Sequence, residues 1–229
     1  MIKMSRVALA AATIAGLGLG VTAVPATAQD NTTQLNILGI TDFHGHIQES
    51  KSKDGEVVEA GAAQLACYVD NRRAKNPDTN FVSVGDNVGG SPFVSSILRD
   101  KPTLDALNAM DLDVSALGNH EFDAGWADLK DRISLDGTGQ AHFPYLGANV
   151  TGGGNLPKAS TVLTTADGVR IGYVGTVTDE TSDLVSPAGI QGIGFTDDVA
   201  AVNKEADRLR TGNEADVIVA LTHSGGDVA

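Results

Sequence analysis

The segment that is most informative about the fold is Val114-Ser115-Ala116-Leu117-Gly118-Asn119-His120-Glu121-Phe122-Asp123. It begins with a short, mostly apolar run, which is followed after Gly118 by a cluster of polar residues. A brief, almost uniformly apolar run is typical of a strand that is buried on both faces. The residues that follow it include an amide, an imidazole and two carboxylates, which can bind cations or transfer protons. Residues 114–123 therefore predict a buried strand whose carboxyl end carries a reactive site.

Similar apolar runs recur on both sides of this segment. The predicted strands are Leu35–Thr41, Phe81–Val84, Val114–Leu117, Tyr145–Ala148, Val169–Gly175 and Val217–Thr222. Amphipathic segments lie between them, with apolar residues at helical spacing. The predicted helices are Ala62–Lys75, Thr103–Met110 and Thr196–Arg210. Strands that alternate with helices in this way indicate an α/β layer fold.

Two of the predicted helices contain features that can be tested directly. In Thr196–Arg210, Thr196 is the expected N-cap and Val199 begins the expected apolar face. In Ala62–Lys75, Cys67 is expected to be a small buried side chain. Cys67 is also the only cysteine of the chain, which excludes an intrachain disulfide and a thiolate metal cluster.

Four predicted strands end in clusters of polar residues. The clusters are Asp42-Phe43-His44, Gly85-Asp86-Asn87, Gly118-Asn119-His120-Glu121 and Thr222-His223. Of the five histidines, only His142 lies away from these strand ends. Each cluster alone has an ordinary structural interpretation, such as a turn aspartate or a surface histidine. Ligands gather beyond the carboxyl ends of strands in α/β sheets, so the coincidence of four clusters favours one shared site.

The residue types in these clusters fit two-metal hydrolysis, in which divalent cations bind carboxylate, amide and imidazole ligands. Asp86 can bridge two cations with its two carboxylate oxygens. Asp42 and His44 can then face one cation, while Asn119 and His223 face the other. Zn²⁺, Mn²⁺ or a similar ion suits this mixed set, and two such ions would activate a water for attack on phosphorus.

One histidine of the clusters, His120, remains available for the leaving group. Asp123 follows it by three residues and could hold the imidazole protonated if the loop turns helically. Glu121 is a rival partner, although the side chain of an adjacent residue usually points elsewhere. His46 is expected either to contact the substrate or to have a purely structural role.

The first 28 residues have the features of a secretory signal peptide. Lys3 and Arg6 precede an apolar run, and Ala26-Thr27-Ala28 forms a small-residue cleavage site. A membrane anchor is the alternative, but the run is rich in alanine and glycine and ends at Pro25. We therefore predict a signal peptide at 1–28 and a mature domain at 29–229, located in the periplasm or at the cell surface without further membrane contact.

The chain is strongly acidic, with a formal net charge of −13 over 229 residues. Loss of Lys3 and Arg6 with the signal peptide would change this charge to −15. Such a surface repels nucleic-acid backbones, which disfavours a polynucleotide partner, whereas a small phosphate ester could bind where cations neutralise the local field. The chain has neither a Gly-x4-Gly-Lys-Ser/Thr loop nor a Gly-x-Ser-x-Gly motif, which disfavours a P-loop nucleoside triphosphatase and a serine hydrolase.

Together, the motifs resemble the calcineurin-like metallophosphatase superfamily, and within it the 5'-nucleotidase and nucleotide-sugar hydrolase branch. The resemblance rests on Ile40–His46, Val84–Pro92 and Ala116–Asp123 and extends from Leu35 to about Asp227. It implies a four-layer αββα sandwich with two central sheets, and a nucleotide or other small phosphate ester as substrate. It also implies roles for the same residues: metal ligands Asp42, His44, Asp86, Asn119 and His223, and the catalytic pair His120 and Asp123.

The resemblance further implies a Gly-His-x-His-like motif and a C-terminal nucleotide-binding domain, whereas the chain ends six residues after His223. We therefore expect residues 29–229 to be an incomplete domain, truncated at its C-terminus and weakly active or inactive alone. A 2',3'-cyclic-nucleotide phosphodiesterase or a nucleotide-sugar hydrolase would use the same ligands. A non-catalytic secreted binding protein is the alternative from another class. The substrate, the native metal and the oligomeric state remain open.

Overall fold

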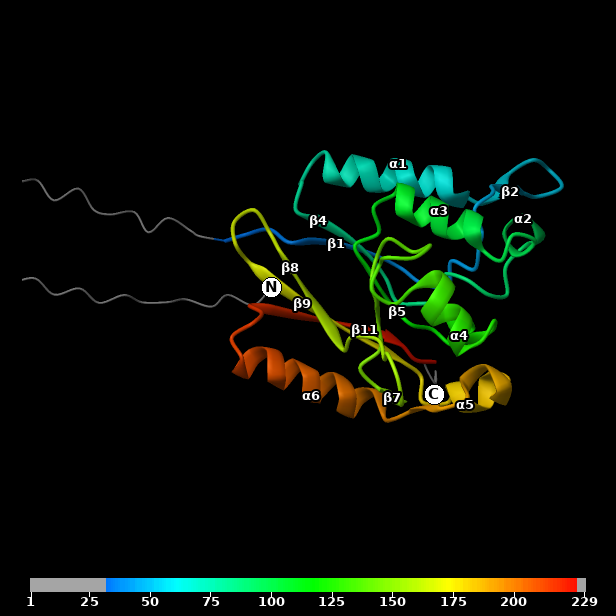
Figure 1. The fold of residues 1–229 in the computed structure, drawn as a ribbon. Coiled ribbons are helices and arrows are strands. Elements are labelled where there is room, and N and C mark those ends of the chain that lie inside the picture. Colours follow the sequence, from blue (N-terminus) through cyan, green and yellow to red (C-terminus); the bar gives the residue numbers. More distant parts are fainter. Residues whose placement is uncertain (1–31, 226–229) are drawn as a thin grey trace, which may run out of the picture. The chain divides into compact units, whose positions relative to one another are not determined.

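A computed structural model describes residues 32–225 of the chain (Figure 1). The predicted signal peptide at 1–28 lies outside the described residues. Within 32–225, every helix is too short or too polar to cross a bilayer.

The first sheet contains four parallel strands in the order β1-β4-β5-β6. Its strands are β1 (Asn36–Ile40), β4 (Thr79–Ser83), β5 (Val114–Ala116) and β6 (Tyr145–Leu146). All four confirm predicted strands to within a few residues. Because the strands are parallel, their carboxyl ends, and the polar clusters that follow three of them, lie at the same edge of the sheet.

The second sheet contains three strands in the order β11-β9-β8. The strands β9 (Arg170–Val177) and β11 (Val217–His223) are parallel and confirm two further predictions. The strand β8 (Ser160–Thr164) runs antiparallel to β9 and was not predicted from the sequence. Its residues are partly buried or exposed, so it lacks the uniform apolar run that identified the other strands.

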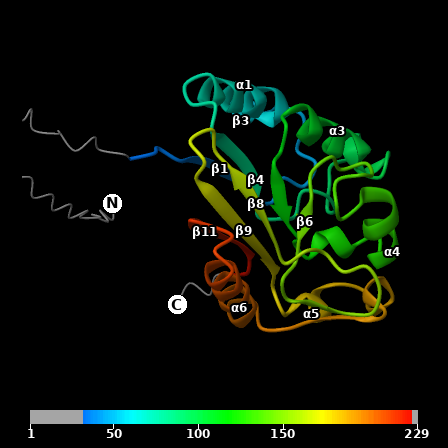
Figure 2. The same ribbon diagram turned by 60° about the vertical axis from the view of Figure 1, so that its left-hand side comes forward.

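Helices cover the outer faces of both sheets, which gives the four layers implied by the family resemblance (Figures 1 and 2). The helices α1 (Gly61–Arg73) and α3 (Lys101–Ala109) pack on the first sheet, where Val69 and Leu104 meet Phe81 of β4. The helix α6 (Asp198–Thr211) packs on β9 of the second sheet. Between the sheets lies a separate apolar cluster: Val82, Val114, Ala116, Leu146, Ile171, Tyr173 and Leu221.

Shorter elements connect these layers. They are β2 (Ser50–Lys51), β3 (Val57–Glu59), β7 (Val150–Gly152), β10 (Ile193–Phe195), α2 (Phe93–Ser96), α4 (Trp126–Asp128), α5 (Thr181–Leu184), the 3₁₀ turns η1 (His120–Phe122) and η3 (Pro187–Ile190), and the π-helical turn η2 (Leu129–Ile133). Both β2–β3 and β7–β10 form small antiparallel pairs at the edge of the fold.

Three local predictions are wrong. Cys67 is exposed, because α1 turns Val69 toward the sheet and leaves Cys67 on its solvent face. The N-cap of α6 is Asp197, whose carboxylate accepts a hydrogen bond from Ala200 N, whereas Thr196 bonds the backbone oxygen of Asn149. Val199 is 63% exposed, so the buried face of α6 begins later in the helix, near Ala206 and Leu209.

Candidate metal centre

The loop after β1 presents Asp42 and His44 from an unusual backbone conformation. Both residues have positive φ angles, 51° and 42°. Their backbone N–H groups donate to carbonyl oxygens of the β4 loop, Asp42 N to Gly85 O at 3.1 Å and His44 N to Asp86 O at 2.9 Å. Left-handed backbone in residues other than glycine persists only where neighbouring contacts hold it, and here the β4 loop provides those contacts.

The loops after β4 and β5 approach each other so closely that glycine is required on both sides. A Cβ atom on Gly85, which has φ of 106°, would lie 2.4 Å from Gly118 N. A Cβ atom on Gly118 would lie 2.1 Å from Oδ1 of Asp86. The two glycines therefore allow the Asp86 carboxylate to lie against the loop that carries His120.

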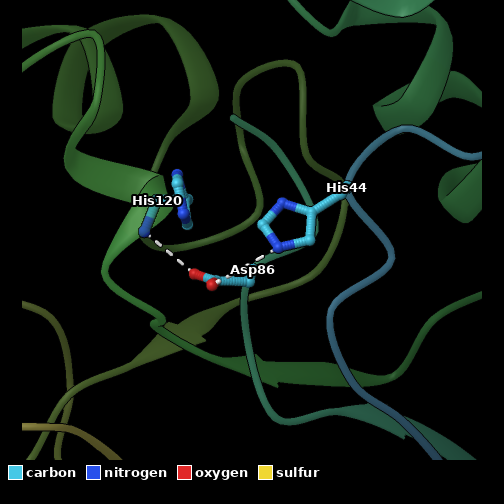
Figure 3. Close-up of side chains that lie close together, drawn as sticks. All are labelled: His44, Asp86 and His120. Atoms are coloured by element: carbon cyan, nitrogen blue, oxygen red, sulfur yellow. Dashed lines mark hydrogen bonds and ion pairs between the residues drawn. The ribbon is translucent and has the colours of Figure 1, made fainter. Parts of the chain in front are cut away.

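The carboxylate of Asp86 lies at the middle of the candidate site and is only 3% exposed. Its Oδ1 accepts a hydrogen bond from His120 N at 2.9 Å, and its Oδ2 lies 3.6 Å from His44 Nε2 (Figure 3). The same Oδ2 lies 3.1 Å from Nε2 of His223, at the end of β11. Asp42 Oδ1 lies 3.7 Å from His44 Nε2. Side chains from both sheets thus meet around one buried carboxylate.

The rings of His44 and His223 are oriented by backbone carbonyls. Nδ1 of His44 lies 2.7 Å from Gly89 O, and Nδ1 of His223 lies 3.0 Å from Val84 O. A carbonyl can only accept, so Nδ1 carries a proton, and Nε2 is the ring nitrogen that faces Asp86 and could bind a cation once it is deprotonated. This is the usual arrangement of a metal-binding histidine, whose other ring nitrogen donates to the protein.

The donor atoms fit a divalent cation by their type and by their convergence. The ligand atoms of Asp42, Asp86 and His223 lie within 4.8 Å of one another, and so do those of His44, Asp86 and His120. Carboxylate and imidazole donors of this kind suit zinc, manganese and similar ions. The division of the ligands between two cations, with Asp42 and His44 on one side, remains a prediction.

Charge interactions within the cluster shift the pKa values of its members. Burial would raise the pKa of Asp86, but the hydrogen bond and charge of His223, with contributions from His120, lower it. Burial would lower the pKa of His223, but the hydrogen bond and charge of Asp86 raise it. The site therefore favours positive charge beside Asp86, as a cation-binding site does.

The predicted pair of His120 and Asp123 is in hydrogen-bonding contact. His120 Nδ1 lies 2.8 Å from Asp123 Oδ2, and the His120 ring meets the His44 ring edge-on at 4.8 Å. Burial would lower the pKa of His120, but the hydrogen bond and charge of Asp123, with the charges of Asp86 and Glu121, raise it. The pair can therefore hold a proton close to the candidate cation ligands.

Asn119 and His46 occupy less central positions. Asn119 directly precedes the turn η1, and its backbone oxygen accepts from Phe122 N. A ligand role for the Asn119 side chain remains a prediction. His46 pairs with Glu59 at 3.2 Å. Both His46 and Glu59 line a cavity of about 390 Å³ that also borders Asp42. Both interpretations of His46, as a substrate contact and as a structural residue, stay open.

Glu121 is the residue whose position the sequence did not reveal. It is 2% exposed, and its carboxylate accepts hydrogen bonds from the backbone N–H groups of Asp86, Asn87 and Gly118. Burial and the charge of Asp86 raise its pKa to about 7, although these three bonds favour the ionised form. The expectation that Glu121 points away from His120 agrees with these contacts. The backbone donors that hold it leave no signature in the sequence.

Comparisons with known proteins agree with this architecture. Residues 35–227 match the family model of the calcineurin-like phosphoesterases. The chain is 35% identical to the cell wall protein Lmo0130 of Listeria monocytogenes, 33% to the endonuclease YhcR of Bacillus subtilis and 31% to human 5'-nucleotidase. These matches cover 92%, 80% and 96% of the chain but only 30%, 16% and 38% of the relatives.

A solved structure shows the same fold. The calcineurin-like phosphoesterase YfkN of Bacillus subtilis superposes with a TM-score of 0.68 at 27% identity, over 84% of this chain and 63% of that one. The match to the family model spans both sheets and every loop of the candidate metal centre. The chain therefore belongs to the calcineurin-like phosphoesterase family.

Proposed function

We propose that this protein hydrolyses phosphate esters of nucleotides with the help of two divalent cations held by Asp42, His44, Asp86, Asn119 and His223. The observation that carries the proposal is the buried Asp86 carboxylate, whose Oδ2 faces Nε2 of both His44 and His223. When bound, the cations would supply Lewis acidity and activate a water.

Residues of the chain would prepare the site for this chemistry. The backbone N–H of His120 occupies Oδ1 of Asp86, so Oδ2, which faces Nε2 of His44 and of His223, is the oxygen that would bind a cation. His120, bonded to Asp123 through Nδ1, would present its Nε2 proton to a phosphoryl oxygen or to the departing alkoxide. Asp123 would keep the imidazole in this orientation and favour its charged form.

A small nucleotide is the proposed substrate, and 5'-nucleotidase activity is the proposed reaction. Human 5'-nucleotidase is among the relatives, and the cavity bordered by Asp42 and His46 adjoins the cation ligands. The net charge of −13 disfavours a polynucleotide, although the relative YhcR is an endonuclease. A cyclic-nucleotide phosphodiesterase or a nucleotide-sugar hydrolase would share the centre.

We also propose that residues 1–28 direct export and that residues 29–229 act outside the cytoplasm. The support is the basic, apolar and small-residue pattern of the first 28 residues, together with the cell wall protein among the relatives. Detection of the processed chain, beginning at residue 29, in the extracytoplasmic fraction of the host would test this.

The catalytic proposal is tested by His120→Ala, with His142→Ala as the matched control because His142 is exposed and precedes β6, at the edge of the sheet opposite the polar clusters. Manganese binding is measured by calorimetry, and phosphate release from adenosine 5'-monophosphate is measured with and without a chelator. We expect His120→Ala to keep manganese binding and to lower turnover about 10²- to 10⁴-fold, the usual contribution of a general acid or base.

His142→Ala should match the wild type in both measurements. Equal turnover by His120→Ala and the wild type would contradict the catalytic role. Manganese binding without any chelator-sensitive hydrolysis in the intact protein would favour a non-catalytic binding protein.

A further inference from the structure

Glu121 lies where the loops after β4 and β5 meet, next to candidate cation ligands, yet it is not one of those ligands. Its Oε2 accepts from Asp86 N at 2.8 Å and from Gly118 N at 2.7 Å, and its Oε1 accepts from Asn87 N at 2.8 Å. The bond to Gly118 is local, whereas the bonds to Asp86 and Asn87 span 35 and 34 residues. The carboxylate therefore ties the β5 loop to the β4 loop.

The β4 loop in turn binds the β1 loop through its backbone carbonyl oxygens. While the N–H groups of Asp86 and Asn87 point to Glu121, their carbonyl oxygens accept from His44 N and Gly45 N at 2.9 and 3.2 Å. Gly85 O similarly accepts from Asp42 N. The positions of Asp42 and His44 thus depend on peptide units whose opposite faces are fixed by Glu121.

The backbone of the β4 loop needs such an anchor. Gly85 and Asp86 have φ angles of 106° and 54°, and a positive φ is uncommon for any residue other than glycine, although aspartate adopts it more often than most. In its ionised form, a buried carboxylate that accepts from three N–H donors supplies strong, charge-assisted bonds that can maintain this backbone conformation. The remaining buried polar residue of the loop, Asn87, bonds Ser83 and Ser115 beneath the site and does not reach the β1 loop by its side chain.

We propose that Glu121 is a positioning residue that sets the cation affinity of the centre by anchoring the β4 loop, and through it the β1 loop. This inference rests on the proposed metal centre. Groups that orient metal ligands without touching the metal commonly change metal affinity by about 10- to 100-fold when they are replaced.

Glu121→Gln is the informative variant, because glutamine keeps the shape but has one oxygen instead of two. In either orientation, its amide N–H₂ must face at least one backbone N–H, of Asn87 or of Asp86 and Gly118, and two donors cannot bond each other. The matched control is Asp113→Asn. Asp113 is a partly buried carboxylate that also accepts from a backbone N–H, Phe81 N at 2.7 Å, but it precedes β5 at the opposite end of the sheet.

Manganese affinity of the wild type and of both variants is measured by calorimetry, alongside backbone amide NMR spectra of the metal-free proteins. We expect Glu121→Gln to bind manganese about 10- to 100-fold more weakly than the wild type, and Asp113→Asn to bind it equally. The amide protons of Asp86, Asn87 and Gly118 should move upfield in Glu121→Gln. In Asp113→Asn, the shift should be confined to residues near Phe81.

Equal affinity in a folded Glu121→Gln would overturn the inference, and so would an equal loss in Asp113→Asn, which would indicate general destabilisation. If Glu121→Gln does not fold, Glu121→Asp replaces it, since aspartate keeps the charge but is one methylene too short to reach the β4 loop. If neither variant folds, the amide protons of Asp86 and Asn87 are measured in the wild type. Downfield shifts and slow exchange with solvent would support the hydrogen bonds to Glu121, and rapid exchange would reject the role of Glu121 as an anchor.

The outcomes separate this inference from the proposed function. A wild type that binds manganese but hydrolyses no nucleotide, with weaker binding in Glu121→Gln, would contradict the proposed reaction and support the anchor. A wild type that binds no manganese would reject the metal centre and the anchor together.

Discussion

At the scale of single residues, the contact between His120 and Asp123 affects the protonation of the His120 imidazole. The 3₁₀ turn η1 brings His120 Nδ1 within 2.8 Å of Asp123 Oδ2. Burial disfavours the charged imidazole, but the bond and the charge of Asp123 outweigh this and raise the pKa of His120. The pair is therefore set to hold a proton at a pH where an isolated histidine would begin to lose it.

Asp123→Asn should lower the pKa of His120 in the metal-free protein, since it removes the charge while keeping the side-chain size. An NMR titration of the His120 ring measures this. Asp105→Asn, which removes an exposed carboxylate paired only with Lys101, is the control. An unchanged pKa in Asp123→Asn would show that the carboxylate does not hold the proton.

The same pair makes a pH-dependent contribution to stability whose sign follows from the raised pKa. The contribution is fully present below the ordinary histidine pKa of about 6.5 and is lost as the pH rises through the higher pKa of folded His120. Asp123→Asn should therefore destabilise the protein more at acidic than at alkaline pH. Both side chains are partly exposed, so the difference should stay below about 1 kcal/mol.

At the scale of elements, α6 shows how one residue decides where a helix begins. Thr196 is the cap expected from the sequence, and two aspartates, Asp197 and Asp198, follow it directly. In the fold, Asp197 accepts a hydrogen bond from Ala200 N at 2.6 Å. The hydroxyl of Thr196 instead donates to the backbone oxygen of Asn149, the residue before β7. The N-cap preferences of threonine and aspartate are too similar to choose between Thr196 and Asp197 from the sequence. The contact of Thr196 with Asn149 decides it, because it leaves Asp197 as the residue that caps the helix.

Asp197→Ala should lower the free energy of unfolding by about 1 kcal/mol, the usual cost of removing an N-cap. Asp207→Ala is the control within the same helix, because Asp207 is exposed and should change stability by less than about 0.5 kcal/mol. Urea unfolding followed by circular dichroism measures both. Equal stability of the two variants would argue against the cap.

At the scale of the whole molecule, the two sheets approach each other closely where β6 packs against β9. A Cβ atom on Gly175 of β9 would lie 2.4 Å from Leu146 Cβ of β6. Leu146 belongs to the cluster between the sheets, beside Val114 and Tyr173. This close approach brings the carboxyl ends of both sheets together, so that His223 can reach the Asp86 carboxylate.

Gly175→Ala should therefore destabilise the protein by about 1 to 3 kcal/mol through overpacking. Gly39→Ala on β1 is the control, because nothing lies within 4 Å of its added Cβ atom. The midpoints of urea unfolding compare the two. If Gly175→Ala were as stable as Gly39→Ala, the sheets would have more room than the structure shows.

The sequence by itself determined the positions of six strands and three helices and the polar clusters at the strand ends. It could do so because buried strands need uninterrupted apolar runs and because Asp42, His44, Asp86 and His223 stand where those runs stop. The spacing of His120 and Asp123 predicted that the two side chains pair, and the structure shows the hydrogen bond between them. The family resemblance added the four layers, which the fold also shows.

Only the tertiary structure decided the order of the strands, the exposure of Cys67, the cap of α6 and the position of Glu121. Strand order and side-chain burial depend on which faces pack together, and the partners of Glu121 are backbone N–H groups, which every residue except proline possesses. A pattern of side chains can show where reactive residues gather. The peptide units that hold them in place become visible only when distant loops are folded against one another.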